Sequence, residues 1–335
     1  MPPHAPAAAP TEIARSPGNP PRIAVFYEHP AWFEAMFAEL ERRGAAVERW
    51  FAPEHSFDPS DASVDVDLVV NRMSPSAFTR GHGHAIAYTT ELLGHLEAAG
   101  ANVIHGASVY RYEFSKARQV ALMARLGIRH PRSRVIHHAT QAASAAEGLR
   151  FPLLVKPNVG GSGAGIRAFE SREDLERASR DGDLDLGPDG IALVQERLRP
   201  RGDSIVRVEV LGGQFLYAIE LQLAGSGSFN LCPADVCCVL DATGAPAEGR
   251  VPVKAAAPPP EVIDTVLRLT AAAGIEVGGV EYLIDDDTGE PVFYDINALS
   301  NFVSDAPTVV GFDPVPRLVD YLLLRAGRAQ HAAAA

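Results

Sequence analysis

Apolar residues in the first third of the chain alternate between short strand-like stretches and runs of helical periodicity. Residues 22–27 and 67–72 are short stretches rich in apolar residues, and residues 102–106 form a third. Residues 31–44 and 89–100 instead carry apolar side chains at helical spacing, and each run ends on a glycine. This alternation predicts a small doubly wound α/β domain, with functional side chains at the carboxyl ends of its strands.

After residue 113 the pattern changes to antiparallel signals. A helical segment at about 115–126 precedes several apolar stretches joined by short turns, among which 204–223 and 279–297 are typical of hairpins. We therefore expect two α+β lobes after the α/β domain. The predicted organisation is a disordered leader at 1–21, the α/β domain at 22–113, a first lobe at 114–190, a second lobe at 191–328 and a tail at 329–335.

The composition narrows the class of protein. Across 335 residues, 42 Asp and Glu outnumber 30 Lys and Arg and give a formal net charge of -12, which argues against a nucleic-acid or anionic-membrane surface. No stretch approaches the ~18 consecutive apolar residues of a membrane helix. Cys232, Cys237 and Cys238 contain no C-x-x-C pair, so we expect a reducing compartment and hence the cytoplasm.

Residues 155–166, VKPNVGGSGAGI, place a lysine at the end of an apolar stretch with four glycines close behind it. A Walker-type phosphate loop would continue with Lys and then Ser or Thr, whereas the last glycine here is followed by Ile166 and Arg167. A dinucleotide fingerprint lacks its third glycine after either Gly161 or Gly163, and the next segment looks like a strand. Both of these interpretations therefore fail.

A glycine loop between two strands can bind a polyphosphate. Glycines permit backbone angles that turn successive N–H groups inward as an anion cradle. Lys156 can reach the same anion as a point charge, and Lys116, which opens the preceding helix, can add a second. The alternative is a mobile, solvent-facing hairpin with an ordinary surface lysine, and the loop alone does not decide between the two.

The last hairpin carries a set of oxygen donors. Strand alternation places Phe293, Asp295 and Asn297 on one face, and Glu281 comes from the partner strand. Two carboxylates and an amide without His or Cys suit Mg²⁺, which proteins normally hold together with substrate phosphates. Exposed acids on a hairpin are the alternative. The acids at 285–287 occupy the turn and are expected to be solvated.

Seven short motifs occur in one order between about residues 65 and 300. They are LVVNRMSPS, SKARQVALMARLGIRHPRS, LLVKPNVGGSGAGI, LVQERL, RVEVLGG, FN at 229–230, and GVEYL with YDIN. In this order they resemble the ATP-grasp superfamily, and within it the branch of glutathione synthetase and the ribosomal-protein glutamate ligase RimK. The resemblance implies an ATP-grasp fold, in which a pre-ATP-grasp α/β domain is followed by two lobes that clamp ATP.

The resemblance also implies roles for particular residues. It implies that ATP is bound by Lys116, Lys156, Gly160, Gly161, Ser162, Gly163, Gly165, Gln195, Glu196, Leu198 and Asp203. It implies that Arg207 and Asn230 face the reacting phosphoryl group, and that Glu281, Asp295 and Asn297 hold two Mg²⁺ ions, with Mn²⁺ as the alternative metal. In that family a substrate carboxylate attacks the γ-phosphate of ATP, and an amine captures the resulting acylphosphate.

The chain departs from the family pattern at several positions. Ser115 replaces the usual Asp before the first lysine, Asp295 replaces the usual Glu, and ALSNFVSD at 298–305 replaces the SPG that often follows the metal-binding Asn. The retained metal donors favour ATP chemistry. The segment expected to line the pocket for the acceptor substrate differs from the family pattern, so neither glutamate nor a ribosomal tail can be assumed as substrate.

Four polar residues after a strand end are candidates for binding a substrate carboxylate: Arg72, Ser74, Arg80 and His82. Ordinary loop polarity is the alternative for each. We expect an ADP-forming carboxylate-amine ligase acting on an amino acid, a small peptide or a peptide side chain, with no nucleic-acid or membrane partner. An ATP-grasp phosphotransferase and a non-catalytic nucleotide-binding protein stay open, as does assembly into a homo-oligomer.

Overall fold

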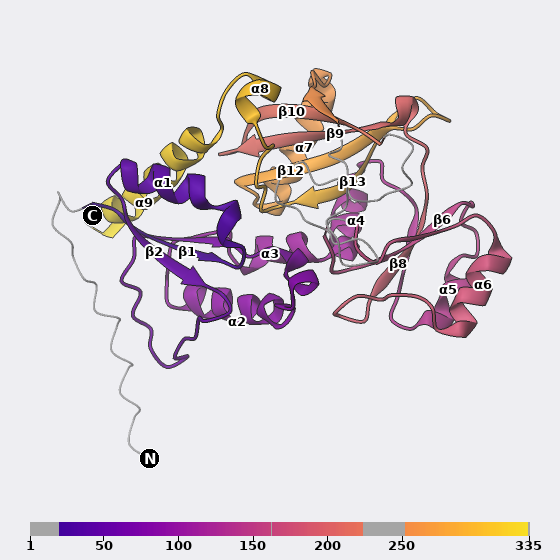
Figure 1. Ribbon diagram of the computed structural model, residues 1–335, viewed down its shortest axis with the longest axis horizontal. Helices are drawn as coiled ribbons and strands as arrows, with labels where there is room; N and C mark the ends of the chain where they lie inside the picture. The colour runs from indigo at the N-terminus through magenta and orange to yellow at the C-terminus, as the bar shows by residue number, and fades with distance from the viewer. Residues whose placement is uncertain (1–19, 162, 224–251, 334–335) are drawn as a thin grey trace, which may run out of the picture.

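A computed structural model describes residues 20–161, 163–223 and 252–333 of the chain. These residues form three sheets, which Figure 1 shows as three neighbouring parts with their own helices. The mixed α/β and α+β architecture is the one expected from the sequence. Nearly all of the expected leader lies outside the described residues.

The first sheet is parallel and belongs to the N-terminal part. Its strands lie in the order β2-β1-β3-β4, as in a doubly wound domain. Its elements are β1 (Arg22–Tyr27), α1 (Glu34–Arg42), β2 (Ala46–Phe51), β3 (Leu68–Arg72), α2 (His84–Ala98), β4 (Val103–Ile104) and α3 (Ala107–Phe114), with 3-10 helices at Pro30–Trp32 and Pro75–Arg80. The apolar pattern does not predict β2, because this edge strand has only half-buried and exposed side chains.

The second sheet is antiparallel, with strands in the order β5-β8-β6-β7. Its elements are α4 (Lys116–Arg125), β5 (Ser133–Ile136), α5 (Ala142–Ala145), β6 (Leu153–Pro157), β7 (Arg167–Phe169), α6 (Arg172–Asp181) and β8 (Ala192–Glu196), with a 3-10 helix at Ala139–Gln141. The expected lobe boundary at 190/191 is corrected here. The turn before β8 looks like a linker in the sequence, but β8 pairs with β5 and β6, so the chain leaves this sheet only after Glu196.

The third sheet has the order β11-β10-β9-β12-β13, and its described strand pairs are antiparallel. Its elements are β9 (Ser204–Leu211), β10 (Gln214–Gln222), β11 (Val253–Ala255), α7 (Pro260–Ala273), β12 (Val277–Ile284) and β13 (Pro291–Asn297), preceded by a 3-10 helix at Arg201–Asp203. Both expected hairpins are present. Val266 and Leu269 of α7 pack with Val208, Val210 and Val280 to form the core of this lobe.

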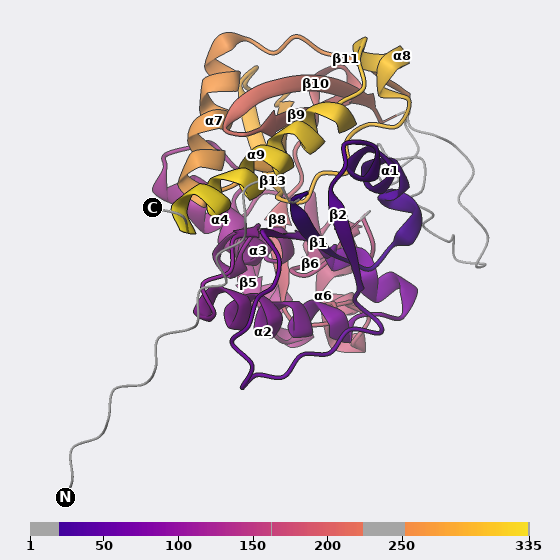
Figure 2. The same cartoon turned by 90° about the vertical axis from the view of Figure 1, so that its left-hand side faces the viewer.

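The C-terminal helix joins the last lobe to the N-terminal part. After α8 (Ala306–Val310), helix α9 (Val315–Ala333) packs against α1 and β3 and continues into the segment expected to be a tail. In Figure 2 it crosses the molecule between the third sheet, above, and the first sheet, below. Leu318 and Leu322 lie in one apolar cluster with Ile23, Leu68 and Ile219, so both parts share a core. No described helix has the length and apolarity to cross a membrane.

Candidate active site

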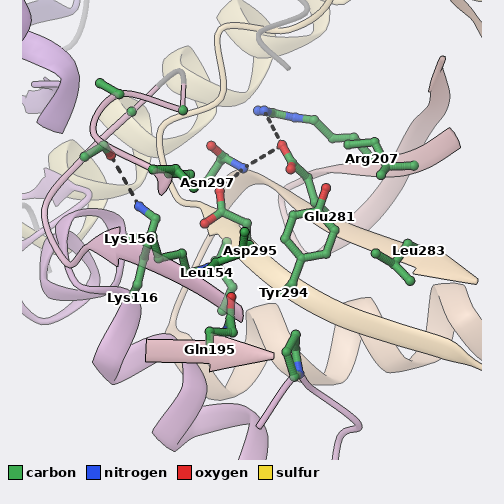
Figure 3. Close-up of a pocket in the computed structure, with 18 of the residues that line it drawn as sticks. Lys116, Leu154, Lys156, Gln195, Arg207, Glu281, Leu283, Tyr294, Asp295 and Asn297 are labelled. Carbon is green, nitrogen blue, oxygen red and sulfur yellow. Dashed lines mark hydrogen bonds and ion pairs between the residues drawn. The ribbon is translucent and has the colours of Figure 1, made fainter. Parts of the chain in front are cut away.

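A pocket of about 760 Å³ opens where the three parts meet, within the range typical of small-molecule sites. Its walls come from the glycine loop and β8, from β9, β12 and β13, and from the N-terminal part. Figure 3 shows side chains of α4, β6, β8, β9, β12 and β13 around the same space. The pocket therefore brings together segments that lie more than 160 residues apart in the sequence, such as Lys116 and Glu281.

The glycine loop joins β6 to β7 and forms one wall. Gly160, Gly161 and Gly163 line the pocket, and Gly163 has a φ of +75°, which L side chains rarely adopt. A Cβ on Gly161 would come within 2.7 Å of Ser76 Cβ, so the loop packs closely on the N-terminal part. Gly165 does not line the pocket: a Cβ there would clash with Asp185 and Pro157, which indicates a packing role. Ser162 lies outside the described residues.

Two lysines approach this loop from different elements. Lys116 begins α4, whose N-terminus is capped by the Ser115 hydroxyl, and its Nζ donates to Gly160 O at 3.4 Å. Lys156 lies at the end of β6 and is 5% exposed. Burial lowers the pKa of Lys156 to about 8; Asp295 and Glu281 oppose the shift and Lys116 adds to it. The two cations would each be stabilised by a bound polyanion.

The oxygen donors of the last hairpin converge opposite the lysines. Glu281 and Asp295 are cross-strand partners in the β12–β13 register. Asn297 Nδ2 donates to Glu281 Oε1 and to Asp295 Oδ2, both at 3.3 Å (Figure 3). The expected grouping of Phe293 with Asp295 on one face is wrong, because the register shifts and leaves Tyr294 as an extra residue. Phe293 consequently packs in the core, and Tyr294 lines the pocket.

The charge of this trio fits a divalent cation. The pKa of Glu281 is raised, first by burial and then by the Asp295 carboxylate, while the Arg207 guanidinium opposes the shift. A cation between the carboxylates would remove their repulsion. The described residues offer no cluster of three or more His, Cys, Asp and Glu for a metal. Two carboxylates and an amide are the donor set that Mg²⁺ uses when substrate phosphates complete its coordination.

Arg207 is held rigidly beside the trio. It lies on β9 opposite Glu281, is 7% exposed, and donates to Glu281 Oε1 at 3.3 Å. Its Nε donates to Glu209 Oε1 at 2.6 Å, and its Nη2 donates to Ser300 Oγ at 3.0 Å. Burial would lower the pKa of Arg207, but the Glu209 and Glu281 carboxylates outweigh burial and raise it. The guanidinium is therefore a fixed positive charge.

The end of β8 and the segment that follows it form another wall of the pocket. Gln195, Glu196, Leu198 and Asp203 all line it, together with Leu154 and other apolar side chains. The Glu196 carboxylate accepts from Arg150 N at 2.9 Å and is paired with Arg132, so its side chain is already occupied. Glu196 N donates to Arg132 O at 3.0 Å and Arg197 N donates to Pro152 O at 2.9 Å, so these two main-chain donors are engaged as well. The apolar walls remain for a flat heterocycle.

The four residues expected to bind a substrate carboxylate separate into two groups. Ser74 lines the pocket, whereas Arg72, Arg80 and His82 do not. Arg72 is buried and donates to Ser300 O at 2.5 Å and to Asn301 Oδ1 at 2.9 Å. Arg80 and His82 both bind the buried Glu28 carboxylate. The expected carboxylate clamp is therefore not supported, because these side chains are engaged in holding loops together.

Other residues correct or extend the sequence interpretation. Asp285 is 4% exposed and accepts from Thr288 Oγ1, so the expectation that all of 285–287 are solvated is wrong at its first member. Glu113, at the end of α3, lines the pocket and no motif pointed to it. In the sequence, only its position three residues before Lys116, across the junction of α3 and α4, could have indicated that it lies near the pocket. Asn230 lies outside the described residues.

Comparison with known proteins confirms the resemblance. Residues 114–233 match the model of the RimK-like ATP-grasp domain. The large chain of carbamoyl phosphate synthase from Rubrobacter xylanophilus is 33% identical over 133 residues, which cover 38% of this chain and 12% of that protein. The chain thus spans about an eighth of this relative's length.

Solved structures share the fold over most of the chain. The ATP-grasp ligase PsnB complexed with its minimal precursor aligns with a TM-score of 0.64 and 19% identity, covering 92% of this chain and 99% of that chain. PsnB has also been solved with minimal precursor, Mg and ADP. An ATP-grasp RimK domain protein from Sphaerobacter thermophilus aligns with a TM-score of 0.63 and 17% identity, covering 90% and 99%. The chain has the ATP-grasp fold.

Proposed function

We propose that this ATP-grasp chain is an ATP- and Mg²⁺-dependent ligase that joins a substrate carboxylate to an amine and releases ADP and phosphate. The observation that carries the proposal is the meeting of the glycine loop, two lysines and the trio of Glu281, Asp295 and Asn297 in one pocket. A phosphate cradle opposite paired carboxylates is the arrangement expected around a nucleotide bound with its metal.

Each wall of the pocket has a part in binding ATP. The N–H groups of the glycine loop, Lys116 and Lys156 would hold the phosphates. The main chain at Glu196 and Leu198 would meet the adenine edge, with Leu154 and Leu283 as apolar walls (Figure 3).

Glu281, Asp295 and Asn297 would hold Mg²⁺. When bound, the metal neutralises charge on the phosphoryl group that is transferred. We propose two ions, with Mn²⁺ as the alternative metal, because the resemblance to the family implies both. These residues bear two carboxylates on adjacent strands, so the cation would also relieve the repulsion that raises the pKa of Glu281.

Arg207 supplies the fixed charge for the transfer itself. Three hydrogen-bond partners hold its guanidinium, so it can stabilise developing negative charge without reorganising. The substrate carboxylate attacks the γ-phosphate and becomes an acylphosphate. An amine then attacks the acyl carbon, and inorganic phosphate leaves. Asn230 keeps its proposed role beside the same group.

The substrate class is a small molecule or a peptide. The pocket of about 760 Å³ has the size of a small-molecule site, and PsnB, which shares the fold, is complexed with its minimal precursor. No nucleic-acid partner and a cytoplasmic location complete the proposal. Ser74 and Asn301 line the end of the pocket nearest the N-terminal part and are candidates for acceptor contacts.

ADP release tests the proposal. The purified chain is incubated with ATP, Mg²⁺ and panels of carboxylates and amines, and ADP is measured by a coupled assay. A ligase releases ADP only when both a carboxylate and an amine are present. ADP release with a carboxylate alone, with a stable phosphorylated product, would identify a phosphotransferase instead. Glu281→Gln serves as the control, since it keeps the shape of the side chain and removes its charge.

A further inference from the structure

Glu113 is a pocket carboxylate for which ATP and Mg²⁺ binding give no role. It lies at the end of α3, two residues before the cap of α4, and lines the pocket on the side of the N-terminal part. Its Oε2 accepts from Leu299 N at 3.1 Å. The Ala298 backbone also hydrogen-bonds to this carboxylate. The segment after β13 thus holds the Glu113 carboxylate in place where it lines the pocket.

The surroundings of Glu113 place it at the reacting end of the pocket. The charged groups that act on it are Asp295 from β13, Arg207 from β9 and Lys116 from α4. Arg72 on β3 also interacts electrostatically with the Glu113 carboxylate. Arg207 is the fixed positive charge, and Asp295 is one of the residues proposed to hold Mg²⁺. Glu113 therefore borders the space in which the phosphoryl group would be transferred.

The pocket needs a group that receives the acceptor amine. An amine in water is mostly an ammonium ion, which cannot attack a carbonyl until it loses a proton. Within the pocket, the acids of the trio are committed to the cation, and the Glu196 carboxylate is paired with Arg132 and Arg150 N. Glu170, Asp203 and Asp286 line the opposite end. Glu113 is the acid left at the reacting end among the described lining residues.

We propose that Glu113 binds the acceptor amine as its ammonium ion and accepts the proton whose loss frees the nitrogen lone pair for attack. This inference rests on the proposed ligase function and adds a catalytic residue and a substrate class, a primary amine, to it. Glu113 takes one proton from the ammonium ion, which leaves a neutral amine. The amine nitrogen then forms a bond to the acyl carbon, the bond from that carbon to the phosphate oxygen breaks, and the second proton of the nitrogen leaves with the phosphate. Glu113 returns its proton to water.

The electrostatics of Glu113 are compatible with this role. Burial, and then the Asp295 carboxylate, raise the pKa of Glu113 to about 7, while a backbone hydrogen bond from Ala298 and the charges of Arg207 and Lys116 oppose the shift. A proton acceptor works best when its pKa lies near the operating pH. A purely structural role, anchoring Leu299 N–H, is the competing explanation that an experiment must separate.

Glu113→Gln separates the two roles. The glutamine carbonyl can still accept the hydrogen bond from Leu299 N, but it cannot accept a proton. The full chain is incubated with ATP, Mg²⁺ and a mixture of the proteinogenic amino acids, with and without hydroxylamine. Hydroxylamine is uncharged at neutral pH and attacks acylphosphates without a catalytic base. Amides are measured by mass spectrometry and hydroxamates by their ferric complexes.

We expect the Glu113→Gln variant to lose amide formation by at least about 100-fold, the usual range for a lost general base. Hydroxamate formation and ATP affinity should stay at the wild-type level, because acylphosphate formation does not use Glu113. Equal amide formation by variant and wild type would overturn this inference alone. Parallel loss of amide and hydroxamate would assign Glu113 a structural role and overturn it too. A wild-type chain that forms neither product with this mixture, nor with the panels of carboxylates and amines used to test the proposed function, would overturn the proposed function and this inference together.

Discussion

The buried ammonium of Lys156 makes ATP affinity depend on pH in a direction that can be worked out. Lys156 is 5% exposed and burial lowers its pKa to about 8. A polyphosphate binds the protonated form and raises that pKa again, so the complex holds more protons than the free protein. Affinity for ATP must therefore fall as pH rises through the pKa of the free protein.

The magnitude follows from the fraction of Lys156 that carries a charge. With a pKa of about 8, about nine-tenths of the free protein is protonated at pH 7 and about one-tenth at pH 9. The apparent Kd for ATP should thus rise about tenfold between these pH values, which corresponds to ~1.4 kcal/mol. The terminal phosphate of ATP is already ionised over most of this range and adds little.

Calorimetric titration of ATP in EDTA, without added metal, measures this effect under the conditions to which the pKa applies. Lys156→Arg is the matched control, because arginine keeps its charge throughout the range. The variant should show a clearly smaller change in ATP affinity between pH 7 and pH 9 than wild type. The pocket carboxylates Glu113 and Glu281, whose pKa values are raised to about 7, add to the pH dependence of both proteins. A wild-type affinity that is independent of pH, or a variant with the same slope as wild type, would refute the assignment of Lys156 to the phosphates.

Three further predictions test other parts of the structure. Asp295→Asn should lower ADP formation by more than about 100-fold while ATP binding without metal persists, as turnover assays and calorimetry can compare. Gly161→Ala should weaken ATP binding, because its Cβ would come within 2.7 Å of Ser76 Cβ; unchanged affinity would mean that the loop is not held in place by this contact. His105 Nε2 accepts from Glu276 N and Val277 N, and burial, followed by the Arg72 charge, lowers its pKa to about 3. On acidification, His105 takes up a proton in the unfolded chain before it does so in the folded chain. The free energy of unfolding should therefore fall by about 2 kcal/mol between pH 7.5 and pH 5. Urea denaturation should show this loss in wild type and a smaller one in His105→Gln.

The parts of the site that the sequence predicted are those in which neighbouring residues carry the signal. The glycine loop with Lys156 is one continuous segment, and Glu281, Asp295 and Asn297 lie on a single hairpin. Within each segment, the order of residues was enough to place these side chains together. That the two segments meet in one pocket followed only from the resemblance to the ATP-grasp superfamily. Strand alternation nevertheless failed at Phe293, because a register shift in β13 cannot be read from the order of side chains.

Other features depend on contacts between distant segments. Arg72 follows a strand end, as a substrate-binding arginine would, but Ser300 and Asn301 take its hydrogen bonds. Glu113 has no motif, and only the packing of α3 against the segment after β13 brings it to the pocket. The sequence places β8 at the start of the second lobe, and only its pairing with β5 and β6 assigns it to the first lobe. Each depends on tertiary pairing that local patterns do not encode.

The most direct test of the central claim is a crystal structure of the chain with a non-hydrolysable ATP analogue and Mn²⁺, whose anomalous signal locates the ion. The account predicts the phosphates beneath residues 160–165, in reach of Lys116 and Lys156, and the ion between those phosphates and Glu281, Asp295 and Asn297. A nucleotide bound elsewhere, or an ion that does not touch both the phosphates and this trio, would contradict it.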